Sequence, residues 1–288
     1  MKEKFKVLFT SSRPLSWVNT AFPFAAGYLY FTHSFDGLFI IGSLFFLIPY
    51  NVLMYGVNDI YDYESDLRNP RKGGVEGAVV AKKYHRFLLF WSYSLPFPFV
   101  ISLLVLGNVV SAFTLAVCLF FVVAYSVKGL RFKEIPILDS VTSSLHFTGP
   151  FVFALSLVGW PSIAWPIVVS FFLWGIASQS FGAIQDIKSD RTAQLRSVAT
   201  VLGANATLWF SLSSYLLASL GIMFLGLYGI IVGIAGLAYI ANLFPYLHIT
   251  DTTSETTNRA WNRFLWINYL VGVVVTVCLL SSAGVLQV

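Results

Sequence analysis

Long apolar stretches separated by short polar segments run through the whole chain. A helix that crosses the hydrocarbon core of a bilayer needs about 20 mostly apolar residues. Nine stretches approach that length, namely residues 15–31, 38–57, 87–106, 109–127, 135–158, 163–184, 206–225, 227–249 and 264–283. Helices satisfy their own backbone hydrogen bonds in lipid, and the alternation typical of a membrane barrel is absent. The pattern therefore predicts an all-α, polytopic membrane protein with nine transmembrane helices.

The composition excludes other classes of protein. Hydrophobic residues make up 57% of the chain and charged residues only 11%, against about 25% charged residues in a soluble domain. A soluble globular protein, a disordered chain and a nucleic-acid-binding protein are therefore excluded, despite the net charge of +5. The expected surroundings are a lipid bilayer. Cys118 and Cys278 both lie in predicted spans, where we expect packing rather than a disulfide or a metal site.

The basic residues predict the orientation. All 18 Lys and Arg fall in the N-terminal segment and in the connections that follow the second, fourth, sixth and eighth spans. With nine spans these segments lie on one side, which the positive-inside rule makes cytoplasmic. An eight- or ten-span chain would break this partition. We therefore expect a multi-pass protein of the cell (inner, cytoplasmic) membrane, with the N-terminus and the active site cytoplasmic and the C-terminus outside.

Two acidic clusters stand where the second and sixth spans end on that side. They contain Asn58, Asp59, Asp62 and Asp66 in the first, and Asp186 and Asp190 in the second. If the helices continue, the aspartates of each cluster share one face. Carboxylates are costly in lipid and repel one another, so they should face the bundle interior and bind cations. Mg²⁺ takes a few carboxylates and binds phosphate oxygens with its remaining positions, so the pattern predicts a magnesium–diphosphate site.

The clusters also indicate an internal repeat. An offset of 124 residues places Asp62 on Asp186, Asp66 on Asp190 and Lys72 on Arg196. Two four-helix halves and an extra ninth helix would then surround a central cavity, with both acidic clusters on the same side of the membrane. We expect a single membrane-embedded domain over residues 1–288.

The spacing Asn58-Asp59-x-x-Asp62-x-x-x-Asp66, together with Asp186-x-x-x-Asp190, resembles the paired signatures of the UbiA-type intramembrane prenyltransferases. The resemblance covers essentially the whole chain. It implies nine helices and the Mg²⁺-dependent transfer of an allylic isoprenoid from its diphosphate to an apolar or aromatic acceptor. It also implies that the five aspartates hold Mg²⁺ and that Asn58 binds the metal or orients its neighbours.

Within that family, residues 11–20, 48–78 and 143–148 are similar to bacterial lycopene elongases. This likeness implies transfer of a dimethylallyl group from dimethylallyl diphosphate to the ends of lycopene, giving C45 and C50 carotenoids. Many members with aromatic acceptors carry Arg and Tyr where this chain has Tyr63 and Gly182, and the missing side chain at Gly182 is expected to leave room for a bulkier acceptor. The alternatives are a quinone precursor, chlorophyllide or a lipid glycerol as acceptor, or a transporter. The sequence identifies neither partner subunits nor a carotenoid cyclase.

The remaining candidates follow from the chemistry that the resemblance implies. Cationic side chains are expected to bind the other diphosphate oxygens: Arg68, Lys72, Lys128, Arg131, Arg13 and Arg196. Side chains expected near the substrates are Tyr55, Tyr61, Tyr125, His146 and Asn19. Aromatic rings stabilise an allylic cation through cation–π contact, and His146 is a candidate base. The connections 67–86 and 187–205 are interpreted as cytoplasmic lids that exclude water.

Overall fold

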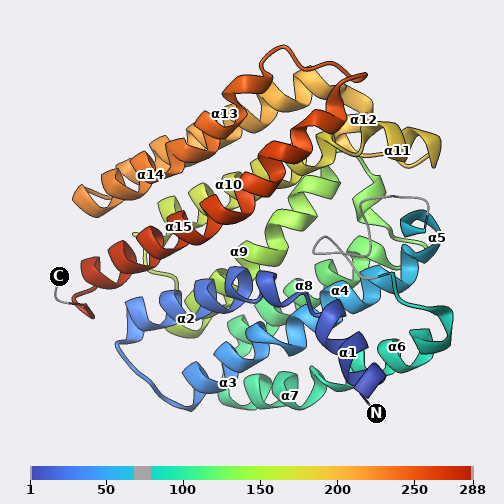
Figure 1. Cartoon of the computed structure of the whole chain (residues 1–288). Helices are drawn as coiled ribbons and strands as arrows, with labels where there is room; N and C mark the ends of the chain where they lie inside the picture. Colours follow the sequence, from blue (N-terminus) through green and yellow to red (C-terminus); the bar gives the residue numbers. More distant parts are fainter. Residues whose placement is uncertain (1, 68–78, 287–288) are drawn as a thin grey trace. The chain divides into compact units, whose positions relative to one another are not determined.

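The computed structural model describes residues 2–67 and 79–286, and these residues form helices and loops with no strand (Figure 1). The helices up to the middle of the chain are α1 (Lys2–Ser11), η1 (Pro14–Ser16), α2 (Val18–Thr32), α3 (Gly37–Leu47), α4 (Pro49–Tyr61), α5 (Tyr63–Asp66), η2 (Lys82–Tyr84), α6 (His85–Ser94), α7 (Phe97–Leu106), α8 (Val109–Ser126), η3 (Phe132–Glu134) and α9 (Leu138–Val158). They are followed by α10 (Ala164–Ile184), α11 (Ile187–Thr192), α12 (Val198–Leu202), α13 (Ala204–Met223), α14 (Leu227–Leu243), η4 (Phe244–Tyr246), η5 (Ser254–Thr257) and α15 (Asn258–Ser282). The all-α prediction is confirmed.

Eight helical segments of the described residues are long and apolar enough to span a membrane. They correspond to the second to ninth predicted spans. The first predicted span, residues 15–31, corresponds to η1 and α2, and α2 has 15 residues. At 1.5 Å per residue α2 is about 22 Å long, shorter than the roughly 30 Å hydrocarbon core. The count of nine, and the orientation derived from it, therefore stay predictions.

The chain divides into two compact units. The first contains Met1–Phe132 and Gly149–Gly159, and the second contains Lys133–Thr148 and Trp160–Val288. The first four predicted spans fall in the first unit, and the sixth to ninth fall in the second. Helix α9 contributes its first half to the second unit and its second half to the first. Each unit is described below by itself.

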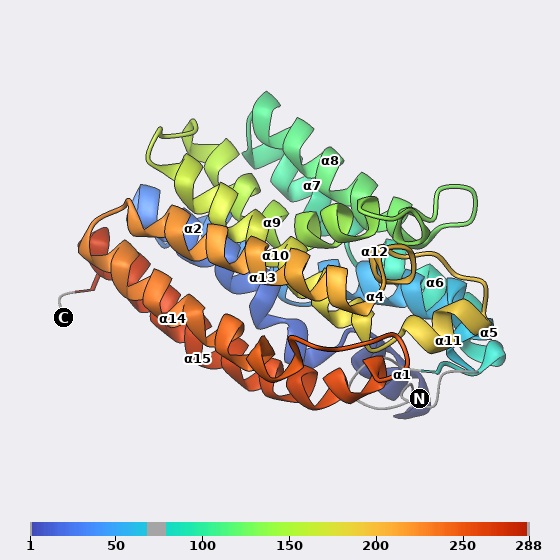
Figure 2. The ribbon, with the colours of Figure 1, turned by 90° about the horizontal axis from the view of Figure 1, so that it is seen from above.

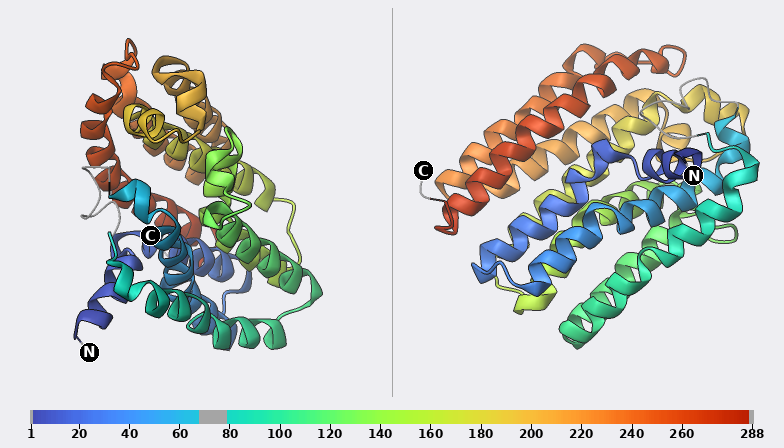
Figure 3. Two further views of the ribbon diagram at one scale, coloured as in Figure 1. Left: turned by 90° about the vertical axis from the view of Figure 1, so that its right-hand side faces the viewer. Right: turned by 60° about the horizontal axis from the view of Figure 1, so that its bottom comes forward.

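In the first unit, α4 lies at the centre and packs against α3, α6 and α8, while α2 and α7 flank α3 (Figure 3). The core is aromatic: the rings of Phe24 and Phe46 lie 5.3 Å apart, and Phe46 and Phe153 lie 5.8 Å apart. All three side chains are buried. Helix α4 is therefore held on several sides, and its C-terminal end carries the first acidic cluster.

A break between α3 and α4 sets the direction of α4. Pro49 has no backbone N–H and its ring displaces the preceding turn, so α3 ends at Leu47. The buried Asn51 amide donates to the carbonyl oxygens of Phe46 (2.9 Å) and Leu47 (3.0 Å). It also donates to the Thr20 hydroxyl at 2.7 Å. Carbonyl groups opened by a helix break need partners in lipid, and Asn51 supplies them.

Replacing Asn51 by leucine should lower the free energy of unfolding in detergent by about 2–4 kcal/mol, because the Leu47 carbonyl would lose this donor and the Phe46 carbonyl would keep only the Thr20 hydroxyl. Denaturant titration monitored by circular dichroism measures the change. Asn205 offers a matched control, since its exposed amide also donates to a backbone carbonyl, Leu247 O at 2.8 Å. The control Asn205→Leu should cost less than about 1 kcal/mol. Equal losses in the two variants would contradict the role of Asn51.

In the second unit, α10, α13, α14 and α15 lie in that order, each against the next (Figures 1 and 2). Phe181, Tyr215, Tyr239 and Phe264 form the buried centre of this layer. The buried Asp139 at the start of α9 accepts hydrogen bonds from the N–H groups of Ser140 (2.7 Å) and Val198 (2.9 Å). Asp139 thereby fixes the start of α12 within this unit, in the connection that follows the second acidic cluster.

Candidate functional site

The first acidic cluster lies at the C-terminal end of α4 and in the short α5. Asp62 stands at the break between the two helices, and helical hydrogen bonds continue on both sides of it: its N–H donates to Asn58 O (2.9 Å), and the N–H of Asp66 donates to Asp62 O (2.8 Å). Asp59 is 1% exposed, and Asp62 and Asp66 are each 7% exposed. Three buried carboxylates within two helical turns need cationic or polar partners.

Two arginines from other segments of the first unit contact this cluster. The Nη2 atom of Arg13 lies 3.0 Å from Asp59 Oδ1, and Nη2 of Arg131 lies 3.7 Å from Asp62 Oδ1. The guanidinium of Arg13 also lies 4.2 Å from the centre of the Tyr55 ring. Burial disfavours the charged guanidinium, but Asp59, Tyr55 and Asp66 together outweigh this effect, and the pKa of Arg13 is raised above its ordinary value. Arg13 therefore stays charged beside the motif.

The side chain of Asn58 connects the cluster to α8. Its Nδ2 atom donates to Asp62 Oδ2 at 2.8 Å and to the hydroxyl of Ser126 at 3.0 Å. Arg131 also donates to the carbonyl oxygen of Tyr61 at 3.5 Å. Asn58 therefore contacts both Asp62 and the end of α8.

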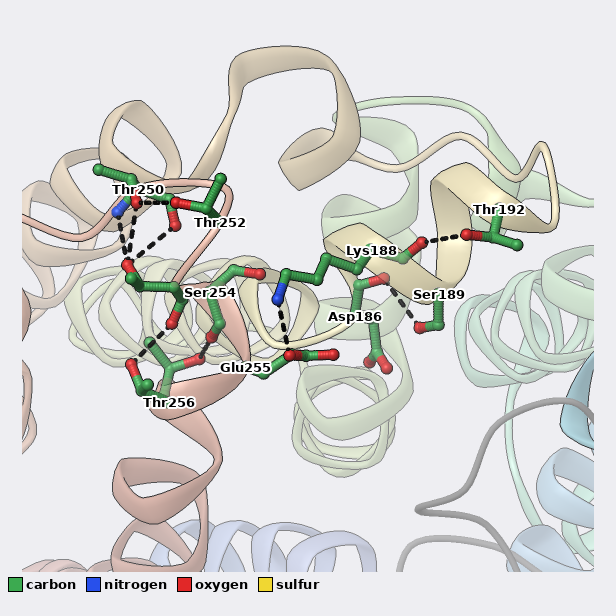
Figure 4. A network of polar contacts seen from close by, with 11 residues as sticks. Asp186, Lys188, Ser189, Thr192, Thr250, Thr252, Ser254, Glu255 and Thr256 are labelled. Atoms are coloured by element: carbon green, nitrogen blue, oxygen red, sulfur yellow. Dashed lines mark hydrogen bonds and ion pairs between the residues drawn. The ribbon is translucent and has the colours of Figure 1, made fainter.

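The second acidic cluster begins where α10 ends and continues into α11. The N–H of Asp190 donates to Asp186 O (2.8 Å), and the hydroxyl of Ser189 donates to the same carbonyl at 2.9 Å. The Lys188 side chain points away from the motif to Glu255, with Nζ 2.8 Å from Oε2 (Figure 4). Both aspartates are half-buried. The predicted spacing of four residues therefore spans one helical turn, with its backbone hydrogen bond formed.

The connection after the second cluster is fastened to the loop before α15. Arg191 Nη1 lies 2.7 Å from Asp251 Oδ2, and Arg191 also donates to Thr200 O at 3.1 Å. Asp251 Oδ1 accepts the N–H of Ala204 at 2.7 Å. That N–H and then Arg191 lower the pKa of Asp251. The proposed lid 187–205 is therefore largely helical and tied at both ends within the second unit.

The other predicted residues lie in several places. Arg68, Lys72 and most of the 67–86 connection lie outside the described residues. Lys128 and Arg196 are exposed on loops, and Asn19, Tyr61 and Tyr125 are half-buried. His146 is buried in the part of α9 that belongs to the second unit. The structure brings Arg13, Arg131 and Tyr55 to the first cluster.

One expectation from the sequence is wrong. The space beside Gly182 was expected to be open for a bulky acceptor. A Cβ atom at this position would lie 2.8 Å and 3.0 Å from two ring carbons of Trp261. The indole of Trp261, on α15, fills the place that a side chain at residue 182 would take.

The donor chemistry of both clusters fits Mg²⁺. Carboxylate and amide oxygens are the hard ligands that this ion prefers. Within residues 2–67 and 79–286, no three His, Cys, Asp or Glu side chains form a group that could hold a metal ion. Mg²⁺ that carries a phosphate needs only one or two carboxylates, since waters and phosphate oxygens complete its shell. The residues that would hold Mg²⁺ are Asn58, Asp59, Asp62 and Asp66 in the first unit, and Asp186 and Asp190 in the second.

Several residues of this region escaped prediction from the sequence. Ser126, Asp251 and Asn258 are single polar residues in helices or loops, and each contacts its partner across a separation of more than 40 residues. No local pattern marks such pairs. For Trp261 the related feature in the sequence was Gly182, whose missing side chain leaves a space that an aromatic ring can fill.

Comparisons with known proteins identify the family of this chain. The sequence pattern of the UbiA prenyltransferase family matches residues 20–269. The lycopene elongase/hydratase of Corynebacterium glutamicum is 48% identical over 283 residues, covering 98% of this chain and 99% of that protein. The C(50) beta-cyclic carotenoids biosynthesis protein LbtBC of a Dietzia species is 49% identical over 96% of this chain and 64% of its own length.

Solved structures share the fold. A UbiA homologue from Archaeoglobus fulgidus, solved bound to DMAPP and Mg²⁺, aligns with a TM-score of 0.67 over 92% of this chain and 98% of that chain. The sequences are 16% identical, so this likeness concerns the fold alone. The family match over residues 20–269 and the 48% identity to the Corynebacterium enzyme support a prenyltransferase and not a transporter. The chain therefore belongs to the UbiA prenyltransferase family and is a multi-pass membrane prenyltransferase, as the paired motifs predicted.

Proposed function

We propose that this prenyltransferase transfers a dimethylallyl group from dimethylallyl diphosphate to the ends of lycopene, giving C45 and C50 carotenoids. The observation that carries the proposal is the 48% identity, over nearly the whole chain, to a lycopene elongase/hydratase. A relative in Halobacterium salinarum with the same name is 30% identical over 94% of the chain. The proposed setting is the cytoplasmic membrane, with the acidic clusters on the cytoplasmic side.

The acidic clusters would act on the donor. Asp59, Asp62 and Asp66 with Asn58, and Asp186 with Asp190, would hold Mg²⁺, which when bound supplies positive charge that stabilises the departing diphosphate. Arg13 and Arg131 already lie beside the first cluster at 3.0 Å and 3.7 Å from its carboxylates. Their guanidinium groups would bind phosphate oxygens. Lys128 and Arg196, with Arg68 and Lys72, are further candidates for these contacts.

The acceptor would then react with the allylic carbon. The C–O bond of the donor breaks and its electron pair leaves with the diphosphate. The π electrons of a terminal double bond of lycopene form the new C–C bond. The cation on lycopene loses a proton to a base, for which His146 is our candidate, or adds water and then loses a proton. The rings of Tyr55, Tyr61 and Tyr125 would stabilise the cations, Asn19 would border the pocket, and the 67–86 and 187–205 connections would exclude bulk water.

Purified protein given dimethylallyl diphosphate and lycopene should form C45 and C50 products with Mg²⁺ and none with excess chelator, because the charge of the leaving group would be uncompensated. Chromatography of the pigments measures both products. Re-addition of Mg²⁺ after chelation should restore the rate, which separates metal loss from denaturation. Product formation under chelation would refute the metal dependence.

The runner-up acceptor is an aromatic or quinone precursor, or another lipid. Pigment analysis of lycopene-producing cells that express the chain distinguishes lycopene from these other acceptors. Unchanged lycopene, with prenylation of an aromatic acid in the same membranes, would favour the runner-up. Conversion of lycopene, with no prenylated aromatic acid, would support the proposal above.

A further inference from the structure

The contact between Gly182 and Trp261 lies close to the second acidic cluster. Gly182 precedes Asp186 by four residues, which is about 6 Å along a helix. The indole of Trp261 lies against the Cα of Gly182, since a Cβ there would come within 2.8 Å of the ring. The ring therefore covers α10 one turn before the motif. A side chain at residue 182 would force it away.

A second contact fixes the position of this indole. Asn258, one turn before Trp261 on α15, donates to the Gln185 side chain at 2.8 Å. Gln185 itself immediately precedes Asp186 in the sequence. The start of α15 is thus joined to the end of α10 by this hydrogen bond and by the contact of the ring with Gly182. These two contacts fix the position of Trp261 along α10 relative to Asp186 within the second unit.

Trp261 is the first ring of an aromatic stack that follows α10 away from the motif. It lies parallel to Phe264, with ring centres 4.8 Å apart and an interplanar angle of 20°. Phe264 in turn lies parallel to Trp174, at 6.3 Å and 19°. From Gly182 to Trp174 the stack covers eight residues of α10, or about 12 Å. Phe264 is buried, but Trp174 and Trp261 are half-exposed.

We propose that the aromatic stack of Trp261, Phe264 and Trp174 binds the reacting end of the polyene acceptor, and that Gly182 is the specificity-determining residue that keeps Trp261 in place. A conjugated polyene is flat and apolar, and the exposed parts of the two indoles offer it aromatic surface, while the buried Phe264 between them holds them parallel. Trp261 provides that surface one turn before the metal motif, where the new C–C bond would form, and Trp174 extends it along α10 away from the motif. The inference rests on the proposed function.

Trp261→Ala should raise the KM for lycopene about tenfold, because an aromatic contact is lost from the acceptor site. The affinity for dimethylallyl diphosphate with Mg²⁺, measured by calorimetry, should change less than about twofold, because the indole carries no charged group that binds phosphate or Mg²⁺. Trp261→Phe should recover most of the loss. Trp266→Ala is the matched control, since Trp266 lies on the same helix and is 73% exposed, and its KM should equal that of the wild type. An unchanged KM in Trp261→Ala, or an equal loss of donor affinity, would overturn the inference.

A double-variant cycle tests the role of Gly182. Gly182→Ala should raise the KM for lycopene about threefold by displacing the indole, and should add nothing in the Trp261→Ala background, because contacting residues are not additive. Additive effects would show that Gly182 acts independently of Trp261. The proposed function fails if the wild type does not convert lycopene, whereas conversion that is insensitive to Trp261 refutes this inference alone.

Discussion

Asp62→Asn and Asp186→Asn should each lower kcat by about a thousandfold or more, because each removes a negative charge from a cluster that we propose to hold Mg²⁺. The substitutions keep the size and shape of the side chain. Asp62 is 7% exposed and accepts a hydrogen bond from Asn58 at 2.8 Å, so its geometry is defined by the fold. Single-turnover product formation at saturating donor measures the loss directly.

Asp36→Asn is the control for this pair of variants. Asp36 caps α3 by accepting the N–H of Phe39 at 3.0 Å, and asparagine caps helices equally well. The activity of the Asp36→Asn variant should stay within about twofold of wild type. The two motif variants should still insert and bind detergent micelles as wild type does. Rates within about tenfold of wild type for Asp62→Asn or Asp186→Asn would remove that residue from the proposed site.

The second to ninth spans could be predicted because each is a long apolar stretch, and hydrophobic length is a local property of the sequence. The first span shows the limit of that rule. Arg13-Pro14 lies just upstream of its apolar stretch. The structure forms the short helix η1 from Pro14 onward, and α2 then has 15 residues. Local geometry at a proline can shorten a helix without changing the hydropathy that predicts it.

The acidic clusters were also predictable, because buried carboxylates at helix ends are rare enough to mark a site. Their partners were not. The sequence offered six cationic residues and placed Arg13 behind Arg68, Lys72, Lys128 and Arg131. Among those that the structure describes, the fold of the first unit brings Arg13 and Arg131 into contact with Asp59 and Asp62. The effect of Gly182 was misjudged for the same reason, since the residue that fills its space, Trp261, is 79 residues away in the sequence. Contacts of this kind depend on packing between helices, not on local pattern.

Arg13→Met should destabilise the protein by about 3–5 kcal/mol, because it removes one partner from a buried ion pair. The Arg13 side chain is 17% exposed and that of Asp59 is fully buried, with 3.0 Å between their charged atoms. The variant would also lose the contact of the guanidinium with Tyr55. Arg13→Lys keeps the charge but loses the planar guanidinium and its contact with the Tyr55 ring. Its free energy of unfolding should therefore lie between those of Arg13→Met and the wild type. Denaturant titration in detergent measures all three proteins.

Arg13→Met/Asp59→Asn separates stability from activity. The Asp59→Asn change removes the charge that Arg13 contacts, so the double variant should regain part of the lost stability. Its activity should remain abolished, because Asp59 is a proposed Mg²⁺ ligand. Lys188→Met is the control for an exposed ion pair, since Lys188 and Glu255 are 45% and 64% exposed, and it should cost less than about 1 kcal/mol. A loss in Arg13→Met no larger than in Lys188→Met would mean that the Arg13–Asp59 pair does not hold the first cluster in place.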